Sequence, residues 1–208
     1  MDKFEGPSGK YIHILAVIRG LESERSKVRR AVEVSNADII GLSISEEELK
    51  GLDDFKSEDA PLANFEEDVY MKGLSKFGDV KKPPPCFLEA RDIANKNGLR
   101  FVALDMNDTE YTEAYVNNVS TIEMIMQTKG ESRLRRRSFR ASTPLEFVLE
   151  FDNAVNARKG FKQLEKLREE HIARQLGRLN KKHANVLAVI EAERAKGVGQ
   201  ALSRYLPR

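Results

Sequence analysis

Charged side chains follow directly after stretches of the sequence that are expected to form buried strands. Arg19 comes after the first such stretch, Asp105 after a later one, and Arg194 just beyond the last. The other polar residues at these strand ends are Ser43, Ser45, Glu191 and Glu193. Guanidinium groups bind carboxylates and phosphates through paired hydrogen bonds, and carboxylate oxygens bind Mg²⁺ or Mn²⁺. These residue types therefore predict an ion-paired network, an anion site or a metal site with oxygen ligands.

Three interpretations of these side chains are open. The arginines can be neutralised by neighbouring carboxylates, which gives a salt-bridged rim without a ligand. Alternatively, Arg19 and Arg194 bind a small anion, with Ser43 and Arg168 completing the site. In the third interpretation, carboxylates hold Mg²⁺ or Mn²⁺ for a hydrolase, and an arginine steadies a phosphate or carboxylate of the substrate. The carboxylates available for ion pairs or for such a metal are Asp105, Glu191 and Glu193.

Predicted strands alternate with helices and position these residues. Each predicted strand is apolar along nearly its whole length, as strands covered on both faces are. This pattern predicts an α/β fold, with an open, mainly parallel or mixed sheet of about four or more strands and helices on both faces. Ligands of open α/β sheets bind beyond the carboxyl ends of the strands, where the residues above lie. We expect one domain over residues 1–208. The predicted strands are residues 11–18, 37–44, 99–106 and 184–190.

Helix signals separate the strands. Ser45 followed by Glu48 is a capping-box pattern and predicts that a helix begins there. Gly98 is expected to end one helix, and Asp108 to cap the helix after the third strand. The closing helix is expected to run from Gly197 onward. The other helical patterns cover residues 22–34, residues 86–97 and a long region from residue 143.

Composition narrows the class of protein. The chain has 208 residues, of which 40% are hydrophobic and 33% charged, so it is neither disordered nor membrane-spanning in composition. Cys86 is the single cysteine, which excludes an internal disulfide and, with only three histidines, nearly excludes a Cys/His zinc site. The first residues include acids and no apolar core, so we expect no signal peptide. We expect a cytoplasmic protein with no membrane role.

Charge is unevenly distributed although the formal net charge is only +2. Residues 45–70 contain ten acidic residues against two lysines, whereas residues 133–140 contain five arginines. Such a run can contact nucleic-acid phosphates, but no recognisable nucleic-acid motif accompanies it. Docking onto the acidic block of the same or a second chain is favoured, and a homodimer joined through the long late helix is the expected assembly. The arginines of the run are Arg133, Arg135, Arg136, Arg137 and Arg140.

Four segments occur in a particular order along the chain. They are a strand that ends in Arg19, ADIIGLSISEEEL at residues 37–49, LREEHIARQLGRL at 167–179, and ANVLAVIEAERAKGVGQAL at 184–202. This order resembles the TraB family of pheromone-shutdown and Tiki-like proteins over most of the chain. In that family the first strand ends in a Gly-x-x-His motif, the second ends near a glutamate, and the late strand runs into another Gly-x-x-His followed by a glycine, here Gly197. Tiki-like members are regarded as metal-dependent peptidases that use those residues.

The signature positions of that family carry other residues here. Arg19 aligns with the first histidine, Arg194 with the second, and Ser43 with the glutamate. An acidic-arginine pair before the late strand aligns with Leu167 and Arg168. Because guanidinium stays protonated and has no lone pair, two arginines repel a divalent cation. The resemblance therefore implies a catalytically inactive relative, a ligand-binding or interaction module that needs no cofactor and binds a small anion.

Overall fold

A five-stranded sheet lies at the centre of the part of the chain that the structure describes. The structure is a computed structural model that describes residues 1–54 and 65–206, without the side chains of residues 53, 54 and 131–133. The strands are β1 (Asp2–Glu5), β2 (Tyr11–Val17), β3 (Ile39–Leu42), β4 (Arg100–Ala103) and β5 (Asn185–Glu191). Their order is β1-β2-β5-β3-β4, with β1 antiparallel to β2 and the other neighbours parallel. Because β5 lies between β2 and β3, strands that are far apart in the sequence become neighbours.

All four predicted strands are confirmed as β2 to β5, and the fold is the predicted α/β class with a mixed sheet. The ends of the strands differ from the predicted ones by at most three residues. β1 was not predicted, because its four residues are mostly polar and three of them are exposed. Such an edge strand lacks the apolar pattern by which buried strands are recognised.

Three helices cover one face of the sheet or lie at its edge: α1 (Glu24–Ser35), α2 (Glu46–Asp54) and α4 (Pro85–Asn97). Val28 of α1 and Phe87 of α4 are buried against Leu187 of β5 in one apolar cluster. α1 and α4 end at Asn36 and Gly98, which both adopt left-handed backbone conformations. The predicted stop at Gly98 is therefore confirmed, and its freedom at positive φ explains the choice of residue.

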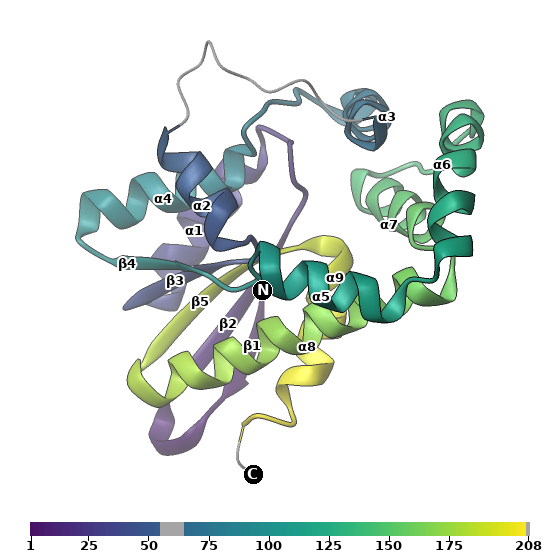
Figure 1. The fold of residues 1–208 in the computed structure, drawn as a ribbon. Helices are drawn as coiled ribbons and strands as arrows, with labels where there is room; N and C mark the ends of the chain where they lie inside the picture. The colour runs from purple at the N-terminus through teal and green to yellow at the C-terminus, as the bar shows by residue number, and fades with distance from the viewer. Residues whose placement is uncertain (55–64, 207–208) are drawn as a thin grey trace.

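Three other helices lie on the opposite face: α5 (Asp108–Asn118), α8 (Lys159–Lys182) and α9 (Ala192–Leu202). Ile172 of α8 and Val198 of α9 are fully buried and pack against Val186 of β5. α5 lies along α8 (Figure 1). α8 thus connects the sheet to α5 and carries side chains toward the carboxyl ends of the strands.

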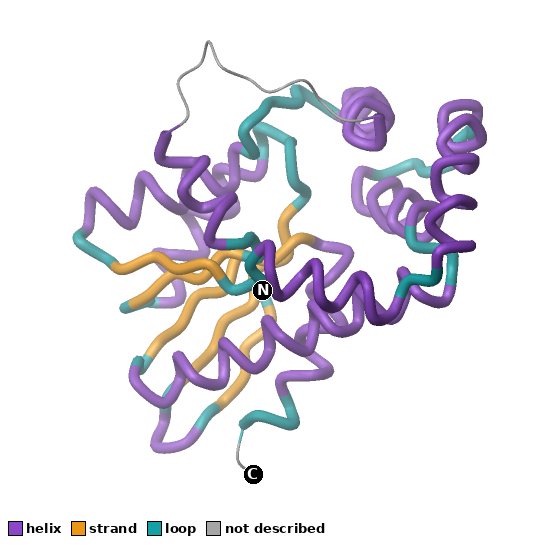
Figure 2. The backbone as a smooth tube through the Cα atoms, in the orientation of Figure 1, coloured by secondary structure: helices purple, strands orange, loops and turns teal. Residues whose placement is uncertain are grey.

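A separate helical layer lies beyond the carboxyl ends of the parallel strands and consists of α3 (Phe65–Leu74), α6 (Thr121–Arg136) and α7 (Pro144–Val155). Figure 2 shows these helices set to one side of the sheet. Aromatic rings hold the layer together, with Tyr70 of α3 edge-to-face on Phe151 of α7 at 5.3 Å between centroids. A Cβ atom at Gly73 would lie 2.2 Å from the Phe147 ring, so close packing requires glycine there. Short 3-10 helices are η1 (Pro7–Gly9) and η2 (Ser75–Phe77).

Several predicted helix boundaries need correction. The closing helix α9 begins at Ala192, directly after β5, and not at Gly197. The side chain that caps α5 is that of Asn107, which accepts from the Glu110 amide at 2.9 Å, and not that of Asp108. The helical region after Thr143 is two helices, α7 and α8. The capping box of Ser45 and Glu48 at the start of α2 is confirmed, with reciprocal hydrogen bonds of 3.1 and 2.9 Å.

No helix in residues 1–54 and 65–206 combines the length and the apolar character that crossing a membrane requires.

Candidate functional site

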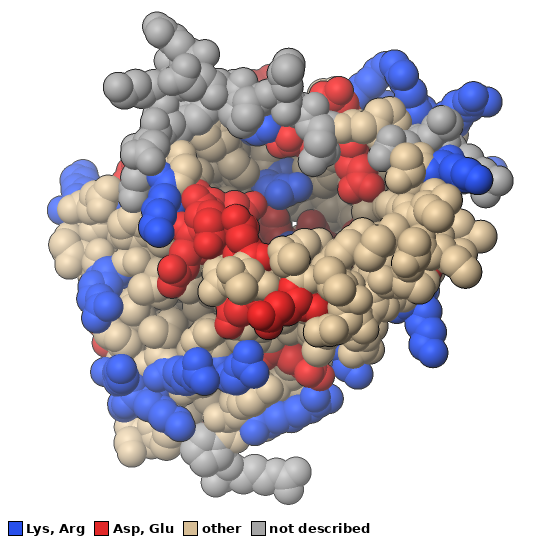
Figure 3. All heavy atoms as spheres, in the orientation of Figure 1, with Lys and Arg blue, Asp and Glu red and all other residues tan. Residues whose placement is uncertain are grey.

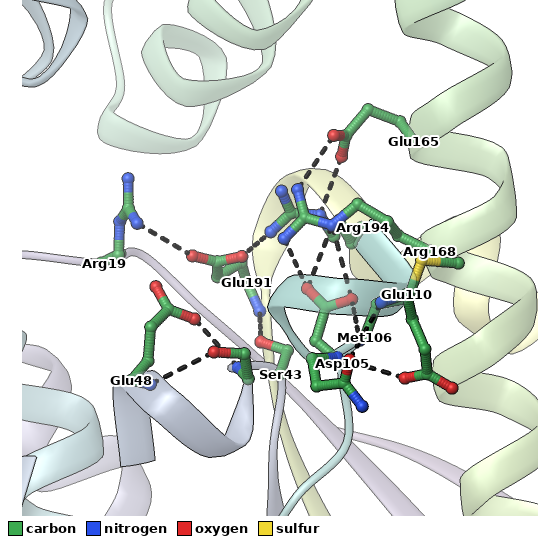
Figure 4. A network of polar contacts seen from close by, with 12 residues as sticks. Arg19, Ser43, Glu48, Asp105, Met106, Glu110, Glu165, Arg168, Glu191 and Arg194 are labelled. Atoms are coloured by element: carbon green, nitrogen blue, oxygen red, sulfur yellow. Dashed lines mark hydrogen bonds and ion pairs between the residues drawn. The ribbon is translucent and has the colours of Figure 1, made fainter. Parts of the chain in front are cut away.

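The predicted arginines meet at the carboxyl end of β5. Arg19 follows β2, whose last residue Val17 pairs with Glu191 at the end of β5. The Nη1 atom of Arg19 lies 3.5 Å from Oε1 of Glu191, and Nη1 of Arg194 contacts the other oxygen of the same carboxylate. Figure 4 shows the two guanidinium groups on either side of Glu191. The structure therefore brings together two arginines that are 175 positions apart in the sequence.

A chain of ion pairs continues from this point to the end of β4. Arg194 Nε donates to Glu165 Oε2 at 2.8 Å, and Arg168 Nη1 donates to Glu165 Oε1 at 2.9 Å. Arg168 Nε also donates to Asp105 Oδ2 at 3.1 Å, and its Nη2 makes a second contact with that oxygen (Figure 4). Three cations thus alternate with three carboxylates, and their formal charges cancel.

Burial differs along this chain of ion pairs. The side chains of Asp105 and Glu191 are 2% and 4% exposed, whereas that of Arg19 is 40% exposed. Burial acts to raise the pKa of Glu165, but the charges of Arg194 and Arg168 outweigh it and lower this pKa. Burial likewise acts to lower the pKa of Arg168, yet Asp105 and Glu165 raise it. The buried charges are therefore stabilised by one another.

Ser43 lies beneath the ion pairs and not among them. It is buried, and its Oγ accepts the backbone N–H of Glu191 at 3.1 Å (Figure 4). Its backbone N–H donates to the Val189 carbonyl at 3.1 Å. Ser43 therefore fixes the end of β5. Ser43 was predicted to belong to an anion site, and its contribution to such a site is to position Glu191.

Two residues of the site were not identified from the sequence. Glu165 bridges Arg194 and Arg168, and its place one turn before Arg168 on α8 is the signal that would have indicated it. Tyr70 comes from α3, and its hydroxyl donates to the Arg19 carbonyl at 2.9 Å. The Tyr70 ring lies 5.6 Å from the Arg19 guanidinium carbon. No local pattern connects Tyr70 with Arg19, because 51 residues separate them.

A crevice of about 420 Å³ opens in front of these ion pairs. Arg19, Arg168 and Arg194 form one part of its lining, and α3, α6 and α7 contribute the other. Figure 3 shows a hollow in this region, with basic side chains inside and acidic side chains around it. Its further acidic lining residues are Glu48, Glu66, Glu67, Asp152, Glu165 and Glu193. The crevice therefore offers both charges to a ligand.

Glu193 differs from the other carboxylates of the crevice. Among the described residues, its Oε2 atom is buried without a hydrogen-bond partner. Burial raises the pKa of Glu193 to about 7, and the nearby Arg19 acts in the opposite direction. Burial also raises the pKa of Asp152, with a further contribution from the charge of Glu165. These two carboxyl groups hold their protons at a higher pH than ordinary acids do.

The predicted metal ligands do not fit a divalent cation. Asp105 and Glu191 are already paired with arginines, whose positive charges would repel the ion. Within residues 1–54 and 65–206, no group of three or more His, Cys, Asp or Glu side chains is arranged to hold a metal. Glu193, the third predicted ligand, lies beside Arg19 and does not complete a set of metal-binding side chains. We therefore derive no chemistry from Mg²⁺ or Mn²⁺ at this site.

Other predicted features lie away from the crevice. Arg137 pairs with Glu150 of α7 at 3.4 Å, an acid outside the predicted acidic block. Arg135 and Arg136 lie at the end of α6, Arg140 follows it, and the side chain of Arg133 lies outside the described part. Burial raises the pKa of the Cys86 thiol to about 12, so this cysteine is packed in the core as a neutral group. Nucleic-acid binding and a homodimer stay predictions.

Gly197, the glycine that follows the second motif, lies where an added side chain would meet the carboxylate of Glu169. A Cβ atom at this position would lie 2.0 Å from the Glu169 side chain. A side chain at Gly197 would therefore displace the Glu169 carboxylate from its present position.

Comparison with known proteins adds no relative. No protein-family model matches the chain, and the search of curated proteins found no match. The resemblance to the TraB family therefore stays a prediction, and the function has to be inferred from the site itself.

Proposed function

We propose that the protein is a catalytically inactive, TraB-like binding module whose crevice takes up a small anion at Arg19. The observation that carries this proposal is the position of the Arg19 guanidinium. It lines the crevice, its side chain is 40% exposed, and its ion pair with Glu191 is 3.5 Å long. Guanidinium N–H groups that one carboxylate does not occupy can donate hydrogen bonds to a second anion.

The other predicted anion-binding residues support Arg19 indirectly. Arg194 and Arg168 each contact two carboxylates and are 13% and 17% exposed, so their donors are largely occupied. Arg194 also holds the second oxygen of Glu191, which leaves Arg19 with a shared partner. A carboxylate or phosphate group of the ligand would give Arg19 an anionic partner that it does not share with Arg194.

Two substitutions support an inactive protein. The positions at which the TraB-like pattern carries histidines hold Arg19 and Arg194 in this chain. Imidazole can ligate a metal ion and guanidinium cannot, so the peptidase chemistry of the Tiki-like members has no ligands here. Binding of an anion is the chemistry that the replacement residues retain.

Thermal unfolding in the presence of inorganic phosphate and citrate tests the proposal. A ligand that binds the folded state raises the melting temperature, by an amount that corresponds to about 2.7 kcal/mol at 100 times its Kd. We expect such a rise for the wild-type protein and for Arg30→Ala, an exposed arginine outside the crevice. Arg19→Ala should abolish it. No rise in the wild type, or an equal rise in Arg19→Ala, would contradict the proposal.

A further inference from the structure

A second cavity of about 350 Å³ adjoins the charged crevice. Arg19 and Tyr70 line both cavities, together with Glu48 and Glu67. The second cavity lies among α2, α3, α4 and the segment that precedes α4. Most of its wall is apolar and includes Ile44, Leu52, Met71, Pro83, Pro84 and Phe87. Arg19 therefore stands at the junction of a polar and an apolar compartment.

Most other charged groups of the apolar cavity have partners inside the protein. Lys82 Nζ lies 2.7 Å from Glu67 Oε2, and Lys81 Nζ lies 3.6 Å from Glu22 Oε2. Glu48 caps α2 through the Ser45 amide. Lys81 is held as loosely as Arg19 but lines only the apolar cavity, whereas Arg19 lines both cavities and has guanidinium donors beyond its 3.5 Å ion pair. A charged group of a ligand is thus directed to Arg19, and its uncharged part has the apolar cavity beside it.

Gly51 of α2 lines the apolar cavity and is exposed. A Cβ atom built at Gly51 meets no described atom within 4 Å. Met71 of α3 also lines this cavity and is partly exposed. Both positions line the cavity, so larger side chains at either of them would reduce its volume.

We propose that the anion bound at Arg19 is amphiphilic: its carboxylate or phosphate contacts Arg19, and its alkyl or aromatic part fills the adjoining apolar cavity. This inference rests on the proposed function and adds the class of ligand. Ligand sites commonly combine a mainly apolar wall with a few polar groups that fix orientation, which is the arrangement here.

Isothermal titration calorimetry with straight-chain carboxylates tests this inference. Butanoate, hexanoate and octanoate differ only in chain length, and each buried methylene should raise the affinity about fourfold. Gly51→Leu and Met71→Trp should each flatten this dependence while phosphate binding stays unchanged. Gly130→Leu in α6, which lies outside both cavities, is the matched control and should bind as the wild type does.

The outcomes separate the inference from the proposed function. If butanoate and octanoate bind equally and phosphate binding still requires Arg19, the inference is wrong and the anion site stands. If neither phosphate nor any carboxylate binds, the proposed function fails. If octanol binds as tightly as octanoate, the apolar cavity acts without Arg19, which also overturns the inference.

Discussion

Arg19 begins one chain of ion pairs and Arg168 lies near its other end, beside Asp105, but the surroundings of the two arginines differ. Arg168 contacts Asp105 and Glu165, is 17% exposed and lies 5.4 Å from the Tyr111 ring. Arg19 forms a 3.5 Å ion pair with Glu191, lies near the buried carboxyl of Glu193 and is 40% exposed. The comparison teaches that an arginine's location at the carboxyl ends of the strands does not by itself decide its role. The ion pairs that it forms and its exposure do, because each paired carboxylate occupies donors that a ligand would need.

The largest effect is expected at the buried end. Arg168→Ala leaves the buried carboxylate of Asp105 without its arginine and removes one of the two arginines of Glu165, which keeps Arg194. Breaking a buried ion pair in this way lowers the free energy of unfolding by about 3–5 kcal/mol. Urea denaturation measures the loss, with Arg178→Ala, an exposed arginine on the same helix, changing stability by at most about 0.5 kcal/mol. Similar values for both variants would remove the distinction between the two ends.

The pH dependence of stability should reflect Glu193, whose pKa burial raises to about 7 from the usual 4.5. Between these values the folded protein holds a proton that the unfolded chain has lost, so stability falls as pH rises through this window. Acidification from pH 8 to 5.5 should therefore stabilise the wild type relative to Glu193→Gln, on the order of 1–2 kcal/mol. Asp152 and Glu169 contribute with the same sign and stay present in both proteins.

Melting temperatures of the two proteins at both pH values check this prediction. Glu165, whose pKa is lowered, acts in the opposite direction, because its contribution is lost as pH falls below about 4.5. The comparison is therefore made above that pH. Identical pH profiles for the wild type and Glu193→Gln would contradict a role for Glu193.

A smaller effect is expected from Tyr70→Phe. The substitution keeps the ring beside Arg19 but removes the hydroxyl that donates to the Arg19 carbonyl. Loss of this hydrogen bond should lower the free energy of unfolding by about 1 kcal/mol and weaken phosphate binding, because the backbone of Arg19 is less firmly held. Urea denaturation and calorimetry measure the two effects, with Tyr205→Phe near the carboxyl end as the control. Unchanged phosphate binding would show that Tyr70 does not position Arg19.

The smallest effect on stability is expected at the exposed end. Arg19→Ala removes a partly solvated ion pair, which contributes about 0–1 kcal/mol, and Glu191 keeps Arg194. The same substitution should abolish the response to phosphate. A large loss of stability, comparable with that of Arg168→Ala, would place Arg19 with the structural residues and not with a ligand.

The parts of the fold that follow from local patterns were predicted. Apolar runs identified the parallel strands, and the Ser45–Glu48 pair identified the start of α2. β1 was not predicted because it is short and polar. The start of α9 was predicted too late in the sequence because the helix follows β5 without a loop. The site was partly predictable for the same reason, since Asp105 and Glu191 are read directly from the ends of strands.

By itself, the sequence determined which charged residues follow the strands, and parallel strands bring such residues to one edge of the sheet. Only the tertiary structure decided their roles. The placement of β5 beside β2 joins Arg19 to Glu191, and the packing of α8 across the sheet brings Glu165 and Arg168 into the same chain of ion pairs. The physical reason is that burial and the number of opposite charges nearby depend on contacts between distant segments. These contacts hold Arg168 and leave Arg19 open to the crevice.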